Sequence, residues 1–203
     1  MSDILAANRP KIISVANQKG GVGKTTTAVS VAAAWVETGH RVLLVDLDPQ
    51  ACATFSLGID PEDLPGEWTL DALAGRGPTP ILQSTDGVDV VPATLDAWRV
   101  DHVFSGQPDR HLLVSSALAE IASTYDHVII DCAPSLGLLT MNALVAATNV
   151  LIPAMCETLA HRGVGQVMQA IGEVSAWANP AVRVSGLLPT RFDDSSAHAQ
   201  AIR

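Results

Sequence analysis

Short runs of apolar residues alternate along the chain with segments of helical character. The apolar runs lack polar alternation, which is typical of parallel strands buried on both faces, and they lie at residues 12–15, 41–45, 88–92, 127–131, 149–153 and 182–188. Helical spacing or alanine-rich composition predicts helices at residues 25–37, 69–74, 94–100, 110–123 and 161–178. The rest of residues 58–87 holds four prolines and five glycines and is predicted to be loop. The pattern predicts an α/β fold, a mostly parallel sheet flanked by helices.

Residues 133–156 carry no charge and are long enough to cross a bilayer. Prolines, threonines and asparagines interrupt this segment, and it divides naturally into a helix and a strand. We therefore interpret it as a buried helix–strand pair rather than a membrane span.

The first predicted strand leads into a glycine-rich loop, residues 16–23, which opens the first predicted helix. In this context such a loop binds phosphate, because its N–H groups and the helix N-terminus attract anions. Lys24 is expected to reach the terminal phosphates of ATP and the Thr25 hydroxyl to hold Mg²⁺. A glycine turn without a ligand is the alternative, but six residue types agree here at fixed spacing. The residues expected to bind nucleotide are Lys19, Gly20, Gly21, Val22, Gly23, Lys24, Thr25 and Thr26.

Three aspartates follow predicted strands that neighbour this loop in the expected P-loop NTPase fold. Asp46 and Asp48 come after the second strand, and Asp131 ends the fourth. Ligands of open α/β sheets bind at these strand ends. One of the first two would help to hold Mg²⁺ while the other orients the attacking water, or both would cap a turn before Pro49. Asp131 would hold Mg²⁺ through a water or cap the next helix.

Charge is distributed unevenly over the 203 residues, whose net charge is −9. Residues 41–131 carry 15 acids against 4 arginines, whereas residues 132–203 carry four of each. Nucleic acid binding needs cations, so only the C-terminal part is a candidate DNA-binding face. The three cysteines match neither a zinc site nor a disulfide framework, and no signal peptide is visible, which favours a reduced cytosolic protein.

Three segments carry a resemblance to a known family. Gln18 replaces the first glycine of the general P-loop pattern, and residues 19–26, Lys-Gly-Gly-Val-Gly-Lys-Thr-Thr, resemble the deviant Walker A box of the ParA/MinD ATPases. Residues 45–50, Val-Asp-Leu-Asp-Pro-Gln, are similar to the family's second signature. Residues 125–140 resemble ParA-type chromosome and plasmid partition ATPases. The family commonly has Gly-Asn after the second signature, whereas this chain has Ala51-Cys52.

The resemblance implies a partition ATPase that uses ATP and Mg²⁺. It implies catalytic roles for Lys19, Lys24 and Asp48, with Lys19 crossing a dimer interface to the partner's nucleotide, and metal-binding roles for Thr25, Asp48 and Asp131. The implied partners are a second copy in an ATP-dependent homodimer, nonspecific DNA and a ParB-type centromere-binding protein that stimulates hydrolysis. The implied location is the cytoplasm, associated with the nucleoid, without membrane attachment.

The expected organisation is an N-terminal extension at residues 1–10 and a P-loop ATPase domain at residues 11–203. Family members continue with a further helix, strand and closing helix, so these C-terminal elements are expected to be missing. Three alternatives stay open: a MinD-like membrane-associated positioning ATPase, an electron-transfer protein like the nitrogenase iron protein, and a nucleotide-binding scaffold with little turnover. The first lacks its amphipathic C-terminal helix here, and the second lacks its cluster cysteine between residues 133 and 155.

Overall fold

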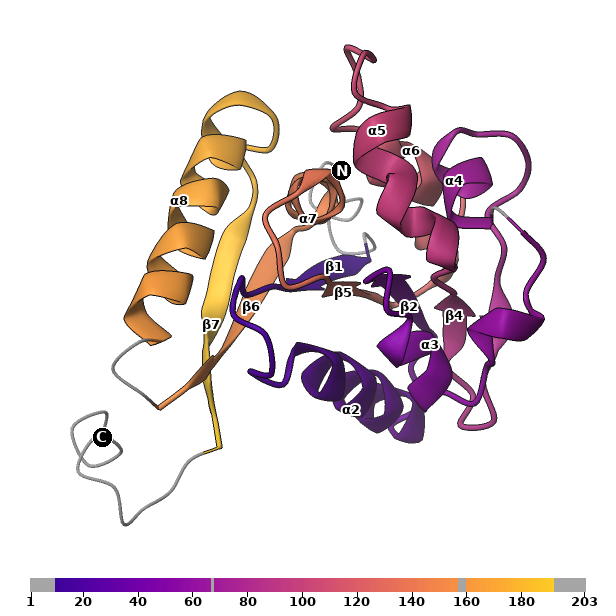
Figure 1. The fold of residues 1–203 in the computed structure, drawn as a ribbon. Coiled ribbons are helices and arrows are strands. Elements are labelled where there is room, and N and C mark those ends of the chain that lie inside the picture. Colours follow the sequence, from indigo (N-terminus) through magenta and orange to yellow (C-terminus); the bar gives the residue numbers. More distant parts are fainter. Residues whose placement is uncertain (1–9, 67, 157–159, 192–203) are drawn as a thin grey trace, which may run out of the picture.

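The computed structural model describes residues 10–66, 68–156 and 160–191 (Figure 1). Residues 1–9 of the expected extension and residues 192–203 of the expected ATPase domain lie outside this part of the chain. The strands are β1 (Lys11–Val15), β2 (Val42–Leu47), β3 (Leu82–Gln83), β4 (Asp89–Val91), β5 (His127–Cys132), β6 (Asn149–Met155) and β7 (Arg183–Thr190). Neighbouring strands follow the order β3-β4-β2-β5-β1-β6-β7, and only the β3–β4 pair is antiparallel.

Helices cover both faces of the sheet. They are α2 (Lys24–Glu37), α3 (Cys52–Ser56), α4 (Trp68–Leu73), α5 (Val100–Val103), α6 (Leu113–Leu118), α7 (Leu138–Ala146) and α8 (Ala160–Trp177), with 3₁₀ turns η1 (Pro61–Asp63), η2 (Leu95–Arg99) and η3 (Ala122–Thr124). Helix α2 lies on one face, and α5, α6 and α7 lie on the other (Figure 1). The predicted α/β fold of P-loop NTPase type, with its mostly parallel sheet, is confirmed.

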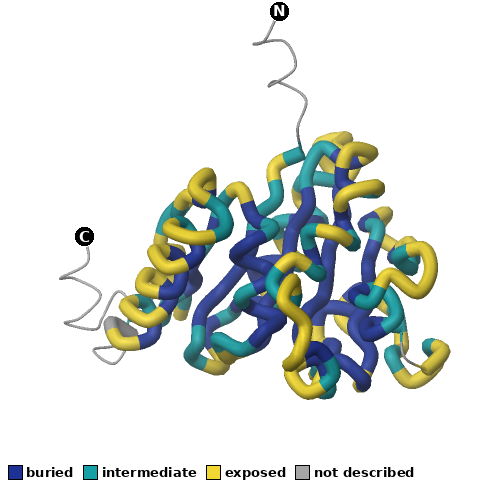
Figure 2. The backbone as a smooth tube through the Cα atoms, turned by 90° about the horizontal axis from the view of Figure 1, so that it is seen from above, coloured by how far each residue is buried: buried dark blue, intermediate teal, exposed yellow. Residues whose placement is uncertain are grey.

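Strand residues contribute alternately to two apolar cores. Leu44 packs with α2 on one face, whereas Leu43 and Val45 pack with the helices of the other face. Each is at most 3% exposed, because a central parallel strand buries both of its sides. Buried backbone runs through the middle of the molecule, and exposed positions lie on the outer sides of helices and in loops (Figure 2). The rigid centre therefore carries the strand ends at which the predicted site residues lie.

The predicted helix at residues 110–123 is wrong in extent. Helix α6 spans only Leu113–Leu118, and η3 follows as a separate turn. The Asn142 side chain of α7 accepts a hydrogen bond from Val114 N at 3.2 Å and donates one to Arg110 O at 2.8 Å. These bonds hold the chain before α6 in a turn, a tertiary contact that periodicity along the sequence cannot reveal.

Strand β3 and helix α3 were not predicted either. Strand β3 pairs with β4 through Leu82–Val90 and Gln83–Asp89, so the segment at residues 58–87 is not all loop around one helix. The turn between them uses Gly87 at φ 80°, and the Ser84 hydroxyl accepts a hydrogen bond from Val88 N at 3.0 Å. Helix α3 has only five residues, too few to show a helical period.

Candidate nucleotide site

The loop between β1 and α2 turns sharply before the helix begins. Gly21 and Gly23 have φ values of 71° and 86°, a left-handed backbone that disfavours any side chain. Gly23 is the N-cap of α2 and has no side chain to cap the helix, so the first N–H groups stay available for a ligand. The loop thus has the backbone geometry that anion binding at a helix N-terminus requires.

Hydrogen bonds to neighbouring strands hold the loop in place. Asn17 donates to Pro153 O of β6 at 2.7 Å and accepts from Lys19 N at 3.0 Å. Thr190, the last residue of β7, donates to Val22 O at 2.8 Å. The loop is therefore fixed at its start by β6, which lies beside β1, and at its middle by β7, the next strand along the sheet.

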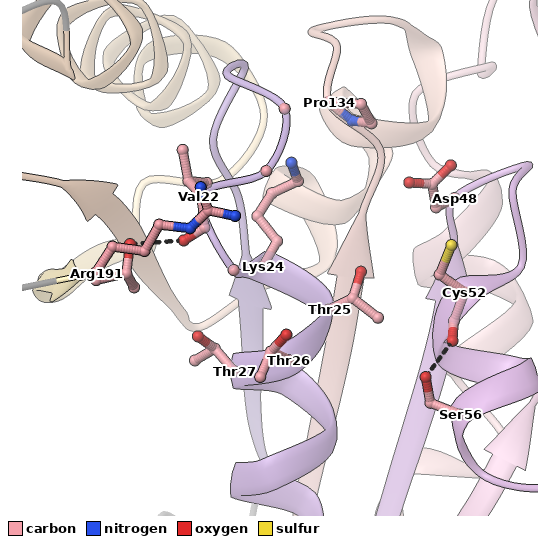
Figure 3. Close-up of a pocket in the computed structure, with 14 residues that line it drawn as sticks. Val22, Lys24, Thr25, Thr26, Thr27, Asp48, Cys52, Ser56, Pro134 and Arg191 are labelled. Atoms are coloured by element: carbon pink, nitrogen blue, oxygen red, sulfur yellow. Dashed lines mark hydrogen bonds between the residues drawn. The ribbon is translucent and has the colours of Figure 1, made fainter.

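The loop lines a cavity of about 640 Å³, large enough for a nucleotide (Figure 3). Seven of the eight predicted nucleotide-binding residues line it, Lys19 being the exception. Asp48 lines it from the far side of Lys24, at the end of β2. The full lining is Gly20, Gly21, Val22, Gly23, Lys24, Thr25, Thr26, Thr27, Asp48, Cys52, Ser56, Pro134, Thr190 and Arg191.

Lys24 is a buried cation between the loop and two carboxylates. Its side chain is only 6% exposed, and Nζ donates to Lys19 O at 3.3 Å. Burial lowers the pKa of Lys24, while the charges of Asp131 and Asp48 oppose that shift. Both of the acids that the sequence assigned to this site are therefore close enough to Lys24 to influence its charge.

Asp131, in β5, carries a buried carboxyl without regular hydrogen bonds. The residue is fully buried, and neither carboxyl oxygen has a hydrogen-bond partner among the described residues. Burial raises the pKa of Asp131 to about 7, and the charges of Asp46 and Asp48 raise it as well. The nearby Thr25 hydroxyl lowers this pKa, although it does not form a hydrogen bond of regular geometry with the carboxyl group. Two orphaned oxygens beside a hydroxyl are the hard donors that Mg²⁺ prefers, so these residues fit that ion.

The donors do not form a closed metal cage. Within the described residues, no three side chains of His, Cys, Asp or Glu gather in a geometry that could hold a metal ion. Magnesium usually keeps several waters and takes one or two carboxylates together with substrate phosphates. The arrangement fits a metal that arrives with a nucleotide better than one bound by protein alone.

The structure distinguishes Asp46 from Asp48, which the sequence left open. The Asp46 carboxylate accepts hydrogen bonds from Asp48 N at 3.0 Å and from the N and hydroxyl of Thr54 at 2.9 and 2.7 Å. Burial raises the pKa of Asp46 to about 6, and the Thr54 bonds lower it. Asp46 therefore joins β2 to α3, while Asp48 presents a carboxylate to the cavity and accepts from Gln50 N at 3.0 Å.

Sequence reasoning missed part of the cavity wall. Ser56 and Cys52 come from α3, Pro134 follows β5, and Thr190 and Arg191 come from the end of β7. None belongs to a phosphate-binding motif. Thr190 and Arg191 could have been proposed from the sequence because they follow a predicted strand, and parallel strands end at one edge of the sheet.

Comparison with known proteins agrees with this geometry. The family model AAA_31, described as an AAA domain, matches residues 10–184. The chain is 42% identical over 194 residues to the chromosome partitioning protein ParA of Myxococcus xanthus, which is 95% of this chain and 69% of that protein. It is 40% identical over 186 residues to the sporulation initiation inhibitor protein Soj of Bacillus subtilis, covering 90% and 73%. The chain belongs to the ParA/Soj family of partition ATPases.

Solved structures place nucleotides in relatives of this partition ATPase domain. A cobyrinic acid a,c-diamide synthase from Mycobacterium smegmatis, solved with ADP and magnesium, is 44% identical with a TM-score of 0.90, covering 95% of this chain and 79% of that one. A putative plasmid partition protein from Borrelia burgdorferi bound to AMPPNP is 25% identical with a TM-score of 0.80, covering 96% of this chain and 81% of that one.

No helix in the described part of the chain is long and apolar enough to span a membrane.

Proposed function

We propose that this chain is an ATP-dependent partition ATPase whose nucleotide binds in the cavity between the glycine loop and Asp48. The observation that carries the proposal is the pair of unpartnered Asp131 oxygens, buried beside Lys24 and Thr25 at the head of the loop. A buried acid without hydrogen bonds is unfavourable in a purely structural role. An Mg²⁺–triphosphate ligand would supply the missing partners.

Each residue of the site has a role in the proposed hydrolysis. The loop N–H groups and Lys24 would hold the β- and γ-phosphates and offset the charge that develops on them. Thr25 and Asp131 would hold Mg²⁺, with Asp48 near the metal and the attacking water. An Mg²⁺ ion held by these residues would supply positive charge that offsets the negative charge of the phosphates. Asp48 suits the orientation of water because it reaches the cavity from the side opposite the loop.

Dimerisation would couple ATP binding to DNA binding. ATP stabilises a dimer if its γ-phosphate contacts a residue of the second copy. Because this contact exists only in the dimer, ATP binding shifts the population from monomer to dimer. We assign that contact to Lys19, which belongs to the loop but does not line the cavity of its own chain. The dimer would bind DNA nonspecifically, and a ParB-type partner would stimulate hydrolysis and release.

Two measurements test this proposal together. Asp48→Ala is expected to lower the ATPase rate by about 100-fold or more while ATP still binds, because the residue acts on water rather than on the phosphates. Asp63→Ala, an exposed acid of η1, is the matched control and should retain the rate. DNA binding should require ATP rather than ADP and weaken with salt, since phosphate contacts release counterions. Equal, negligible rates in wild type and Asp48→Ala would favour a scaffold without turnover.

An amide synthase is a second candidate function. The 44% identity to a protein solved as cobyrinic acid a,c-diamide synthase with bound ADP and magnesium supports it. The two candidates differ in what accompanies ATP consumption. A partition ATPase should be stimulated by DNA together with its partner protein, whereas a synthase should consume ATP only with a carboxylate acceptor and an amino donor.

A further inference from the structure

Asp46 is a buried carboxylate that closes the turn between β2 and α3. Its Oδ1 accepts a hydrogen bond from Asp48 N at 3.0 Å, and its Oδ2 accepts from Thr54 N at 2.9 Å and from the Thr54 hydroxyl at 2.7 Å. The turn lies between these two partners, which are six residues apart in the sequence. One side chain therefore holds both the start of the turn and the short helix that follows it.

The backbone of this turn is strained. Ala51 has a φ of 49°, a left-handed conformation that a residue with a side chain adopts only at a cost in energy. Its N–H donates to Asp48 O at 2.8 Å, and Gln50 N donates to the Asp48 carboxylate at 3.0 Å. Strain of this kind persists where surrounding contacts determine the conformation. The hydrogen bonds of Asp46 at the two ends of the turn are contacts of this kind.

Thr54 connects the turn to a second strand. Its hydroxyl donates to Asp46 and accepts from Ala93 N, just beyond β4, at 3.0 Å. Thr54 and Ala93 are both fully buried. Breaking one of these bonds would leave a buried polar group without a partner, which is costly, so the bonds fix the turn relative to β2 and β4.

Asp48 is the acid of this turn that reaches the cavity, where it lies across from Lys24 (Figure 3). Asp46 is only 1% exposed and is not among the described residues that line the cavity. A catalytic group that moves by about 1 Å can lose about 100-fold in rate. We infer that Asp46, through its bonds to Asp48 N and Thr54, is a positioning residue that holds Asp48 where it acts on the attacking water. The inference rests on the proposed function.

Asp46→Asn tests this role because it removes one acceptor at almost the same volume. Asparagine has one carbonyl oxygen and one NH₂ group, whereas Asp48 N and Thr54 N are both donors. The NH₂ group must face one of these donors, so the turn loses a bond whichever way the amide is oriented. We expect kcat for ATP hydrolysis to fall about 10-fold to 100-fold. The affinity for Mg²⁺–ATP, measured by calorimetry, should change by less than about twofold.

Variants of Thr54 and a matched control separate positioning from a general loss of stability. Thr54→Val removes the hydroxyl and should lower kcat at least about fivefold, whereas Thr54→Ser keeps it and should stay within about twofold of wild type. Asp96 is also buried, and it accepts hydrogen bonds from Leu70 N at 2.7 Å and from the Thr94 hydroxyl. Asp96→Asn should therefore destabilise the fold in urea unfolding but leave kcat unchanged. If Asp46→Asn does not fold, the two Thr54 variants decide the question.

The Asp48→Ala background shows whether Asp46 acts through Asp48. A residue that acts only by positioning that carboxylate loses its effect when the carboxylate is absent. Adding Asp46→Asn to Asp48→Ala should therefore lower the single-turnover rate by less than about twofold. A further tenfold loss in the double variant would overturn the positioning role, because Asp46 would then act on the reaction by another route.

Other results would also decide against the inference. Unchanged kcat in folded Asp46→Asn would leave Asp46 with a role in folding alone. A fivefold or greater loss of Mg²⁺–ATP affinity would place Asp46 at the metal site beside Asp131, its neighbour in the register of β2 and β5. Wild-type protein that does not hydrolyse ATP, or a full rate in Asp48→Ala, would refute the proposed function itself and the positioning role with it.

Discussion

Replacing Asp131 by asparagine is expected to stabilise the empty fold while removing Mg²⁺-dependent nucleotide binding. Burial raises the pKa of Asp131 from 3.8 to about 7, and both carboxyl oxygens lack partners. Each tenfold change in proton affinity corresponds to about 1.4 kcal/mol, so the ionised carboxylate destabilises the fold by as much as about 4 kcal/mol. Asn removes the charge at almost the same volume. We expect Asp131→Asn to raise the free energy of unfolding by about 2 to 4 kcal/mol at pH 8.

The stabilisation should depend on pH with a definite sign. Between pH 3.8 and about 7 the folded state keeps the Asp131 proton while the unfolded state loses it, so wild-type stability falls as pH rises. The variant does not titrate at this position. Its advantage should therefore be small near pH 4, grow up to about pH 7 and stay constant above. A ligand offsets much of this advantage, because Mg²⁺–ATP at 100 times its Kd adds about 2.7 kcal/mol to wild type alone.

Urea unfolding followed by circular dichroism at pH 4.5, 6 and 8, with EDTA and without nucleotide, measures this effect. Asp126→Asn, next to the other end of β5, is the matched control. A side-chain hydrogen bond from Arg41 lowers the pKa of Asp126 to about 2, so this carboxylate stabilises the fold above pH 4 and the control variant should lose stability. A gain for Asp131→Asn that does not change with pH, or a loss at pH 8, would refute the reasoning.

Two other variants test the loop and its support. Lys19→Ala should leave nucleotide binding by the monomer largely intact but prevent ATP-dependent dimers, and normal dimers in sedimentation velocity would contradict the contact across the interface. Gly163→Ala should weaken ATP binding at least fivefold by calorimetry, because its Cβ would come within 2.8 Å of Asn17 Oδ1, the acceptor for Lys19 N. Gly165→Ala in the same helix meets nothing within 4 Å and should bind ATP normally, so equal losses in both glycine variants would point to α8 in general.

The pattern of residues along the sequence predicted correctly those elements whose structure depends on their own residues. The buried strands ending at Val15, Leu47 and Cys132 show in the sequence as apolar runs, because central parallel strands bury both faces. The glycine loop shows as well, since its residue types are set by the backbone turn and by phosphate chemistry. The extent of helix α6 did not show, because Asn142 of α7 defines where it begins, and strand β3 did not show, because only its pairing with β4 defines it.

The sequence by itself determined the fold class, the phosphate-binding loop and the candidate acids, because each depends on neighbours within a few residues. Only the tertiary structure decided which of those acids is held by hydrogen bonds within the protein and which has oxygens left for a ligand. Asp46 is satisfied by Thr54, whereas the Asp131 carboxyl remains without hydrogen-bond partners among the described residues. Tertiary structure also brought Arg191 to the cavity by joining Thr190 to a loop 168 positions earlier in the chain. Burial and hydrogen-bond satisfaction are properties of packed surroundings, and no single segment of the chain contains them.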